Sequence, residues 1–266
     1  MSSTPSVAVL MCVYNECPHL KTAIESILEQ TWSSFRFVVV DDASTDGSSE
    51  LLTEYAASDD RINLVENESN IGLTPSLNRG LEEISSDYVV RIDGDDISAP
   101  ERIERQVKFM ERRERVVVAG TWYDVIDEDG TQIDHVEFPT NSDEVRSVLI
   151  KYNPLLHSST ILRRDVVDRV GGYDIRYSRA QDYDLWLRLA QHGEIVNIPE
   201  TLATRRYTSD CVSLNAEDEQ LRCAIRARIE AIRRGQYPLT AGRYLLKPTL
   251  KYLLPAQARN TIRKFV

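Results

Sequence analysis

The sequence of 266 residues has no apolar run that approaches the roughly 18 residues needed to cross a bilayer as a helix. The apolar stretch at 7–13 is short, follows no basic residue and runs into Asn15 and Glu16. It is therefore typical of a buried strand and not of a signal peptide. These absences argue against an integral membrane protein, and we expect a cytoplasmic one.

Two cofactor motifs are also missing. The four cysteines lack the C-x-x-C spacing of zinc and redox sites, which predicts ordinary reduced thiols. No G-x-G-x-x-G follows the stretch at 7–13, and this disfavours a dinucleotide-binding dehydrogenase.

Basic residues are outnumbered by acidic ones except at the C-terminal end. The net charge of −10 argues against a nucleic-acid binder. From Leu221 onward, eleven Lys or Arg stand against one acidic residue, Glu230, so this part carries +10 and residues 1–220 carry −20. The two parts are expected to face different partners.

Negative charge is concentrated where an apolar run at 88–92 ends. Three carboxylates, Asp93, Asp95 and Asp96, follow that run within four residues. Like charges this close resist ionisation unless a cation or hydrogen-bond donors lie among them. Mg²⁺ or Mn²⁺ suits oxygen ligands and phosphates. The alternative is a loop, or a cap for the helix that Pro100 opens, although a cap needs only one carboxylate.

Strands and helices alternate four times in the first hundred residues. Apolar stretches at 7–13, 35–40, 62–65 and 88–92 are separated by helical segments, of which one opens at Pro18 and another has Thr74 as its expected N-cap. This alternation predicts a mostly parallel sheet with helices on both faces, where ligands bind beyond the carboxyl ends of the strands. Polar residues fall at those ends and are expected to converge, although loops are often polar for no functional reason: Asn15, Glu16, Asp41, Asp42, Asn67, Asn70, Asp93, Asp95 and Asp96.

The second half of the chain is less regular. We expect a helix from 100 to about 113, a strand at 116–120 and a hairpin whose turn is the DEDG sequence at 127–130. Asn141 is expected to cap a short helix that ends near residue 150. The QDYD sequence at 181–184 opens another helix, where the helix dipole alone favours acidic residues. Local sequence therefore does not decide between a capping and a chemical role for Asp182.

The C-terminal part differs in kind. Helices are expected at about 216–234 and 244–254, and Arg243, Lys247 and Lys251 recur every four residues beside five leucines. A basic stripe beside apolar surface suits peripheral contact, through 239–266, with the inner face of an anionic membrane. The alternative is a terminal helix packed on the acidic body.

Five motifs follow one another along the chain. They are VAVLMCVYNE at 7–16, VDDASTDG at 40–47, the segment at 70–80, RIDGDDI at 91–97, and GGYD at 171–174 with QDY at 181–183. In this order the chain strongly resembles the family 2 glycosyltransferases, over about residues 5–213. The resemblance implies an α/β GT-A fold at 1–213, with a nucleotide-sugar half at 1–100 and an acceptor half at 101–213. Residues 214–266 would form a basic helical extension.

The resemblance also implies roles on the donor side. The loop after the first strand, with Cys12, Tyr14 and Glu16, would line the nucleotide pocket, and Asp42 would accept a hydrogen bond from the base. Asp95 would bind Mn²⁺ or Mg²⁺ directly. Asp93 would face the ribose or a metal-bound water.

On the acceptor side, Asp182 matches the general base. It would take the proton of an acceptor hydroxyl as that oxygen attacks the anomeric carbon, which inverts the anomeric centre. His157 lies where acceptors bind in the family, with a structural histidine as the alternative. Trp186 is a candidate sugar platform, with a core residue as the alternative.

The chain departs from the family pattern at three points. Gln181 stands where Glu is frequent, and Thr208 stands where many members have a histidine near the metal. The Q-x-x-R-W element and membrane spans of processive synthases are missing, so we expect transfer of a single sugar in glycan or glycolipid biosynthesis, with a UDP-sugar favoured. A haloacid-dehalogenase-type phosphatase fits Asp93 and Asp95 only loosely, and a non-catalytic sugar-nucleotide binder or scaffold is the remaining alternative.

Overall fold

The structure is a computed structural model, which describes residues 4–207 and 217–253. The expectations for Thr208, for Cys211 and for the boundary at residue 213 lie outside these ranges.

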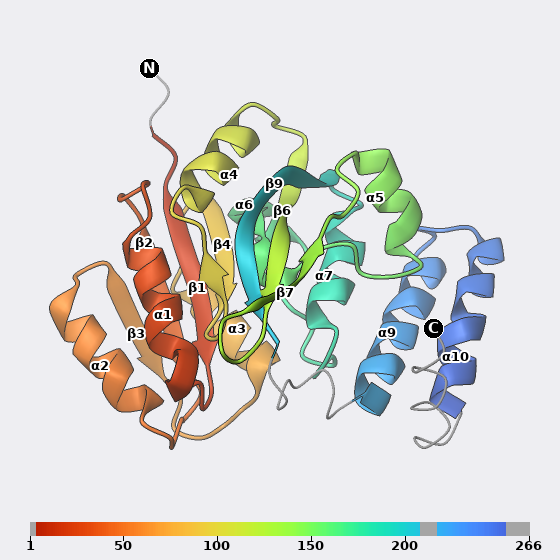
Figure 1. Ribbon diagram of the computed structural model, residues 1–266. Helices are drawn as coiled ribbons and strands as arrows, with labels where there is room; N and C mark the ends of the chain where they lie inside the picture. The colour runs from red at the N-terminus through yellow and green to blue at the C-terminus, as the bar shows by residue number, and fades with distance from the viewer. Residues whose placement is uncertain (1–3, 208–216, 254–266) are drawn as a thin grey trace.

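One sheet runs through the described part of the chain (Figure 1). Its strands are β1 (Val7–Val13), β2 (Arg36–Asp41), β3 (Ile62–Glu66), β4 (Tyr88–Asp93), β5 (Ile97–Ser98), β6 (Val116–Ile126), β7 (Gln132–Val136), β8 (Ile161–Arg163) and β9 (Glu194–Arg206). Their order across the sheet is β3-β2-β1-β4-β8-β6-β9-β5, with β7 paired to β6. The first four run parallel, β8 is antiparallel to both of its neighbours, and β6 and β9 are parallel again. The predicted mostly parallel sheet is confirmed.

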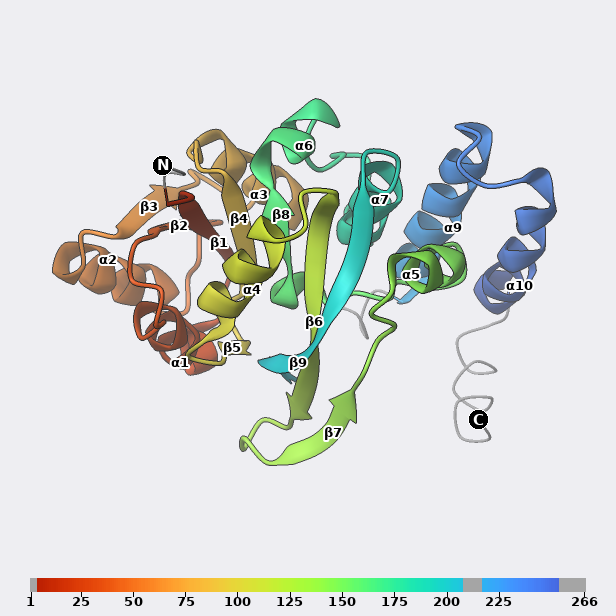
Figure 2. The same cartoon turned by 90° about the horizontal axis from the view of Figure 1, so that it is seen from above.

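Helices cover both faces of this sheet (Figure 2). Successive side chains of a strand point to opposite faces, and along β1 Val9 and Met11 enter one apolar core while Leu10 and Cys12 enter the other. The first core is closed by α1 (Cys17–Leu28), α2 (Ser48–Ser58) and α4 (Arg102–Glu111). The second is closed by α3 (Leu73–Glu82), α5 (Ser142–Leu149), α6 (Arg164–Arg169) and α7 (Gln181–Leu189).

Most of the predicted helix starts are confirmed, and one is wrong. Pro18 lies in the first turn of α1, and the side chain of Asn141 accepts hydrogen bonds from the first turn of α5. Thr74 was expected to cap α3, but that helix begins at Leu73, so Gly72 occupies the cap position and Thr74 lies in the first turn. The buried hydroxyl of Thr74 instead donates to the carbonyl of Tyr177, 2.6 Å away. A long-range bond therefore replaces the expected local cap.

The sequence did not predict β9, which spans 13 residues. Pro199 interrupts its apolar pattern. The register against β6 passes from Ile198 directly to Thr201, so Pro199 and Glu200 have no partner residue in β6. Proline has no N–H to donate, and an irregularity of this kind accommodates it within a strand.

The C-terminal extension consists of α9 (Glu217–Arg233), the 3₁₀ turn η2 (Leu239–Leu245) and α10 (Leu246–Leu253). α9 packs against α7, and α10 lies on the outer side of α9, away from the sheet (Figures 1 and 2). The expected helix at 216–234 is confirmed. None of the described helices is long and apolar enough to cross a membrane.

Candidate functional site

The carboxyl ends of β1, β2 and β4 lie side by side at one edge of the sheet. In the strand register Cys12 lies opposite Asp93, and Val13 lies opposite Asp41. A Cβ atom added to Gly94 would lie 3.4 Å from Cγ of Glu16, so the loop after β1 packs directly on the turn after β4. The topology thus brings together polar residues that are about 80 positions apart in the sequence.

A buried arginine, Arg91, forms an ion pair with Asp93. The side chain of Arg91 is fully buried, and its guanidinium donates to the Asp93 carboxylate and to the carbonyl of Leu10 at 3.3 Å. The backbone N–H of Asp93 donates to the hydroxyl of Ser158 at 2.9 Å. Burial is the largest single influence and raises the pKa of Asp93, but several opposing effects, led by the charge of Arg91 and including that of Arg205, together hold that pKa below its usual value. Asp93 is therefore a fixed, ionised carboxylate.

The neighbouring carboxyl groups are perturbed in the opposite direction. Burial, followed by repulsion from Asp93, raises the pKa of Asp95 to about 6. Burial and repulsion from Asp95, Asp93 and Asp96 raise the pKa of Glu16 to about 8. The pKa of Asp96 is also raised, by burial and by the same neighbours. The site thus holds more negative charge than the protein itself neutralises.

This charge excess fits a divalent cation. Carboxylate oxygens are the donors that Mg²⁺ and Mn²⁺ take, and a cation here would relieve the repulsion on Asp95 and Glu16. Over the described residues, no group of three or more His, Cys, Asp or Glu side chains is arranged so that it could hold a metal ion by itself. A metal held by Asp95 would therefore need further ligands such as phosphate oxygens or water.

Asp42 lies in a closely bonded loop after β2. Its Oδ1 accepts the side-chain amide of Asn67 at 2.6 Å and the backbone N–H of Ile71 at 2.9 Å, and its Oδ2 accepts the N–H of Gly72 at 2.8 Å. These donors hold the carboxylate in one orientation. Gly72 has a positive φ of 90°, a conformation that glycine adopts without strain.

Cys12 and Tyr14 lie on the β1 side of the same edge. Burial raises the pKa of the Cys12 thiol to about 12, so it is a neutral, unreactive group at the base of the site. Tyr14 is exposed, and its ring is accessible to a ligand.

Asp182 lies in the first turn of α7, after Ala180, whose φ is 53°. The amide of Asn153 donates to Asp182 Oδ2 at 2.7 Å, and Asn153 Oδ1 in turn accepts the N–H of Leu155 at 3.3 Å. This second bond fixes which end of the amide faces the carboxylate. Burial raises the pKa of Asp182, and the negative charge of Asp93 adds to the increase. The hydrogen bonds from Asn153 and the Tyr183 backbone oppose that increase.

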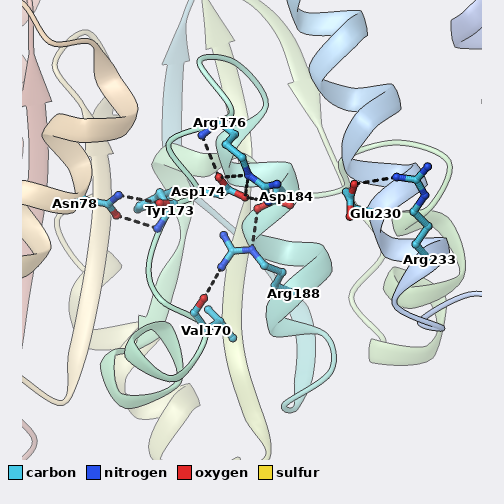
Figure 3. Close-up of polar contacts among 9 residues, drawn as sticks. All are labelled: Asn78, Val170, Tyr173, Asp174, Arg176, Asp184, Arg188, Glu230 and Arg233. Atoms are coloured by element: carbon cyan, nitrogen blue, oxygen red, sulfur yellow. Dashed lines mark hydrogen bonds and ion pairs between the residues drawn. The ribbon is translucent and has the colours of Figure 1, made fainter.

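The second acid of the QDYD sequence, Asp184, has a different environment. It is fully buried, and its Oδ2 accepts Nε of Arg188 at 2.7 Å, while Arg188 Nη1 reaches the carbonyl of Val170 (Figure 3). In the same view, Asn78 bonds both the N–H and the carbonyl of Tyr173. Asp184 therefore holds α7 to the preceding segment through Arg188, whereas Asp182 accepts a side-chain hydrogen bond from Asn153.

The structure corrects one of the acceptor-side predictions. Trp186 is fully buried in the apolar core, so its ring offers no face to a sugar, and the core alternative is favoured. His157 packs edge-on against Trp186 and bonds the hydroxyl of Tyr173 at 2.7 Å. Its burial lowers the pKa of the ring to about 3. A neutral, largely enclosed His157 fits the structural alternative better than direct contact with an acceptor.

Sequence reasoning missed the residues that β9 brings to the site. The N–H of Arg206 donates to Asp96 Oδ1 at 3.0 Å, and its guanidinium donates to the carbonyls of Asp95, Asp127 and Glu128. Arg205 lowers the pKa of Asp93 and Asp95 by its charge. No local signal marked these arginines. Arg91 was detectable, because it lies two residues before Asp93 and so on the same face of a buried strand.

Comparisons with known proteins assign the family. Residues 8–171 match the family described as Glycosyl transferase family 2. EpsE of Bacillus subtilis (strain 168), a protein named as a glycosyltransferase, is 35% identical over 99% of this chain and 95% of its own. The amylovoran biosynthesis glycosyltransferase AmsE of Erwinia amylovora is 32% identical over 77% of this chain and 78% of its own. The chain belongs to glycosyltransferase family 2, as the sequence motifs predicted.

Solved structures show the same fold. The mannosyltransferase PcManGT of Pyrobaculum calidifontis, in complex with GDP-Man and Mn²⁺, has a TM-score of 0.69 at 20% identity and covers 93% of this chain and 70% of its own. TarS 1–349 of S. aureus, in complex with UDP-GlcNAc, has a TM-score of 0.66 at 18% identity, over 84% of this chain and 66% of its own. The predicted GT-A arrangement is confirmed.

Proposed function

We propose that this family 2 glycosyltransferase is an inverting, metal-dependent enzyme that moves a single sugar from a nucleoside diphosphate sugar to a hydroxyl acceptor. The observation that supports this proposal is that two kinds of carboxylate interact electrostatically: the cluster after β4 and Asp182 in the first turn of α7, whose pKa the charge of Asp93 raises. Asp93 and Asp95 form an excess of negative charge suited to a cation, and Asp182 is a partly buried carboxylate with a raised pKa.

On the donor side, Asp42 would accept a hydrogen bond from the nucleotide base, and the loop with Cys12, Tyr14 and Glu16 would enclose the nucleoside. Asp95 would hold Mn²⁺ or Mg²⁺, and Asp93 would face the ribose or a metal-bound water. When bound, the cation neutralises the diphosphate and stabilises the charge that grows on it as it leaves. Complexes of structural relatives with GDP-Man and with UDP-GlcNAc support a nucleotide-sugar donor. Between these bases, we favour uridine.

On the acceptor side, Asp182 would take the proton from the attacking hydroxyl. Burial makes its carboxylate a better proton acceptor than an exposed aspartate, and the Asn153 amide holds the oxygen in place. Direct displacement by an acceptor on the opposite face of the sugar inverts the anomeric centre.

The names of related proteins support an acceptor in surface polysaccharide synthesis. AmsE is named for amylovoran biosynthesis, and WbnJ of Escherichia coli, 30% identical over 69% of this chain, is named for O-antigen biosynthesis. A growing glycan or a lipid-linked oligosaccharide is the acceptor class that we infer.

The test is a transfer assay with a panel of UDP-, GDP- and TDP-sugars, Mn²⁺, and lipid-linked glycans extracted from membranes. We expect one donor to be consumed, a product whose anomeric configuration by NMR is opposite to that of the donor, and loss of turnover in EDTA. A product with retained configuration would contradict the role of Asp182. Nucleotide binding with no turnover of any donor would favour the scaffold alternative.

A further inference from the structure

The outer face of α10 is apolar and open to solvent. Leu246, Leu250 and Leu253 are 64%, 62% and 71% exposed, and none of the residues of α10 is buried. Spacings of four and three residues place the three leucines on one side of the helix. Scattered exposed leucines are common on proteins, but a continuous row of them on one helix face marks a surface that binds something apolar.

Basic residues flank this row. Arg243 lies three residues before Leu246, and Lys247 lies three residues before Leu250; both are exposed. Lys251 is paired with Glu217 at the start of α9, 2.6 Å away, and this pair ties α10 to the rest of the extension. The side chain of Tyr244 lies beneath two cations, Lys151 at 5.5 Å and Arg243 at 4.8 Å. The result is an apolar row bordered by positive charge.

The extension is held firmly enough to present this face in a fixed direction. Arg228 of α9 is buried and donates to the carbonyls of Ile150 and Lys151 at 3.0 and 2.8 Å, and to the hydroxyl of Tyr183 at 3.1 Å. Since Tyr183 belongs to α7, the helix that carries Asp182, α9 is fastened to the catalytic body. α10 packs on α9 and leaves Leu246, Leu250 and Leu253 exposed to solvent.

The charge of the chain restricts what can cover this face. The segment at 254–266 contains Arg259, Arg263 and Lys264 and no acidic residue. If it covered the leucines, its positive charges would be repelled by the basic residues that flank them. A second copy of the same face would meet the same repulsion. An anionic lipid surface suits both features, because leucines enter the acyl boundary while Arg and Lys lie among the phosphates.

We propose that Leu246, Leu250 and Leu253, with Arg243 and Lys247, form a surface that docks on anionic membranes. Residues 1–220 carry −20, so the rest of the molecule is repelled from such a membrane and only this end approaches it. α10 runs toward the side of the molecule where β1 and β4 have their carboxyl ends (Figure 1). Docking would bring the candidate site near a lipid-linked acceptor; this last consequence rests on the proposed function, whereas the docking itself does not.

The test is sedimentation of the full chain with vesicles of phosphatidylcholine alone or mixed with phosphatidylglycerol. We expect binding only to the mixed vesicles and weaker binding as salt is raised. Replacing Leu250→Ser together with Leu253→Ser should lower the partition coefficient roughly tenfold or more, because both apolar contacts are lost. Lys247→Gln should lower it about fivefold. Ile133→Ser, at a half-exposed residue of β7, is the matched control and should bind like the wild type.

The vesicle assay has three results that would overturn the proposal: no binding to either vesicle, equal binding to both, or unchanged binding by the leucine variant. A dimer of the wild type that Leu250→Ser converts to a monomer would also overturn it, since the face would then be an interface between copies. A second assay, hydrolysis of the nucleotide sugar in solution without vesicles, separates this test from that of the proposed function. The leucine variant should hydrolyse the donor as fast as the wild type. If the wild type shows no hydrolysis at all, the proposed function fails, but the vesicle result still decides whether the surface docks on membranes.

Discussion

Replacement of Asp182 by asparagine tests the assignment of the general base. Asparagine has nearly the same shape and keeps one oxygen that accepts the Asn153 amide, so the change loses at most about one hydrogen bond, worth roughly 1 kcal/mol of unfolding free energy. The loss of a general base lowers turnover roughly 10²- to 10⁴-fold. That loss corresponds to about 3–5 kcal/mol in the barrier. A large fall in kcat with nearly unchanged stability and donor affinity is therefore expected.

The matched control is Asp184→Asn, on the same helix turn. Asp184 is fully buried and paired with Arg188, so its neutralisation leaves the largely enclosed Arg188 guanidinium without a carboxylate partner and should cost about 3 kcal/mol of unfolding free energy. Because it does not face the site, kcat of the folded protein should change little. The assay is steady-state release of nucleoside diphosphate, with urea unfolding of each variant. If Asp182→Asn keeps kcat within threefold of the wild type, Asp182 is not the base.

Three further predictions concern the groups around the site. Asn153→Ala removes a hydrogen bond that lowers the pKa of Asp182, so that pKa should rise further. The acid limb of the pH profile of kcat/KM should therefore move to higher pH. An unmoved limb would show that the Asn153 amide does not affect the pKa of the base. Arg91→Met removes the buried cation that faces Asp93. Because the Asp93 side chain is itself 35% exposed, water compensates in part and the cost should be about 1–2 kcal/mol. The double variant with Asp93→Asn should lose clearly less than the sum of the single changes, and additive losses in urea unfolding would mean that the two groups do not interact. Burial holds the pKa of His157 near 3 in the folded protein. As pH falls below about 6.5, only the unfolded chain protonates this histidine, so the free energy of unfolding should decrease by about 1 kcal/mol per pH unit. In His157→Gln the free energy of unfolding should depend less steeply on pH in this range.

The fold of the first hundred residues was predictable because each signal there is local. Apolar stretches at strand length alternate with helical periodicity, and the ends of parallel strands must meet at one edge. The positions of Asp42, Asp93 and Glu16 at the site follow from that topology alone. The same reasoning failed for β9, where Pro199 breaks the pattern that marks a strand and the partner β6 lies about 80 residues earlier.

The chemistry around each site residue was less predictable, because it depends on contacts distant in sequence. Asp182 and Asp184 are equivalent in a helical pattern, and only the packing of Arg188 and Asn153 separates them. Helical spacing likewise could not say whether Trp186 faces a ligand or the core. Its complete burial depends on how α7 is turned against the sheet.

The measurement that tests the central claim most directly is a calorimetric titration of the full chain with UDP, GDP, TDP and CDP, each with Mn²⁺, with Mg²⁺ and with EDTA. We expect one diphosphate to bind tightly, and only with a metal, because the carboxylates around Asp95 repel a bare diphosphate. Asp95→Ala should remove the metal dependence. Equal affinity in Mn²⁺ and in EDTA, or no binding of any diphosphate, would contradict a metal-assisted nucleotide-sugar site at this edge of the sheet.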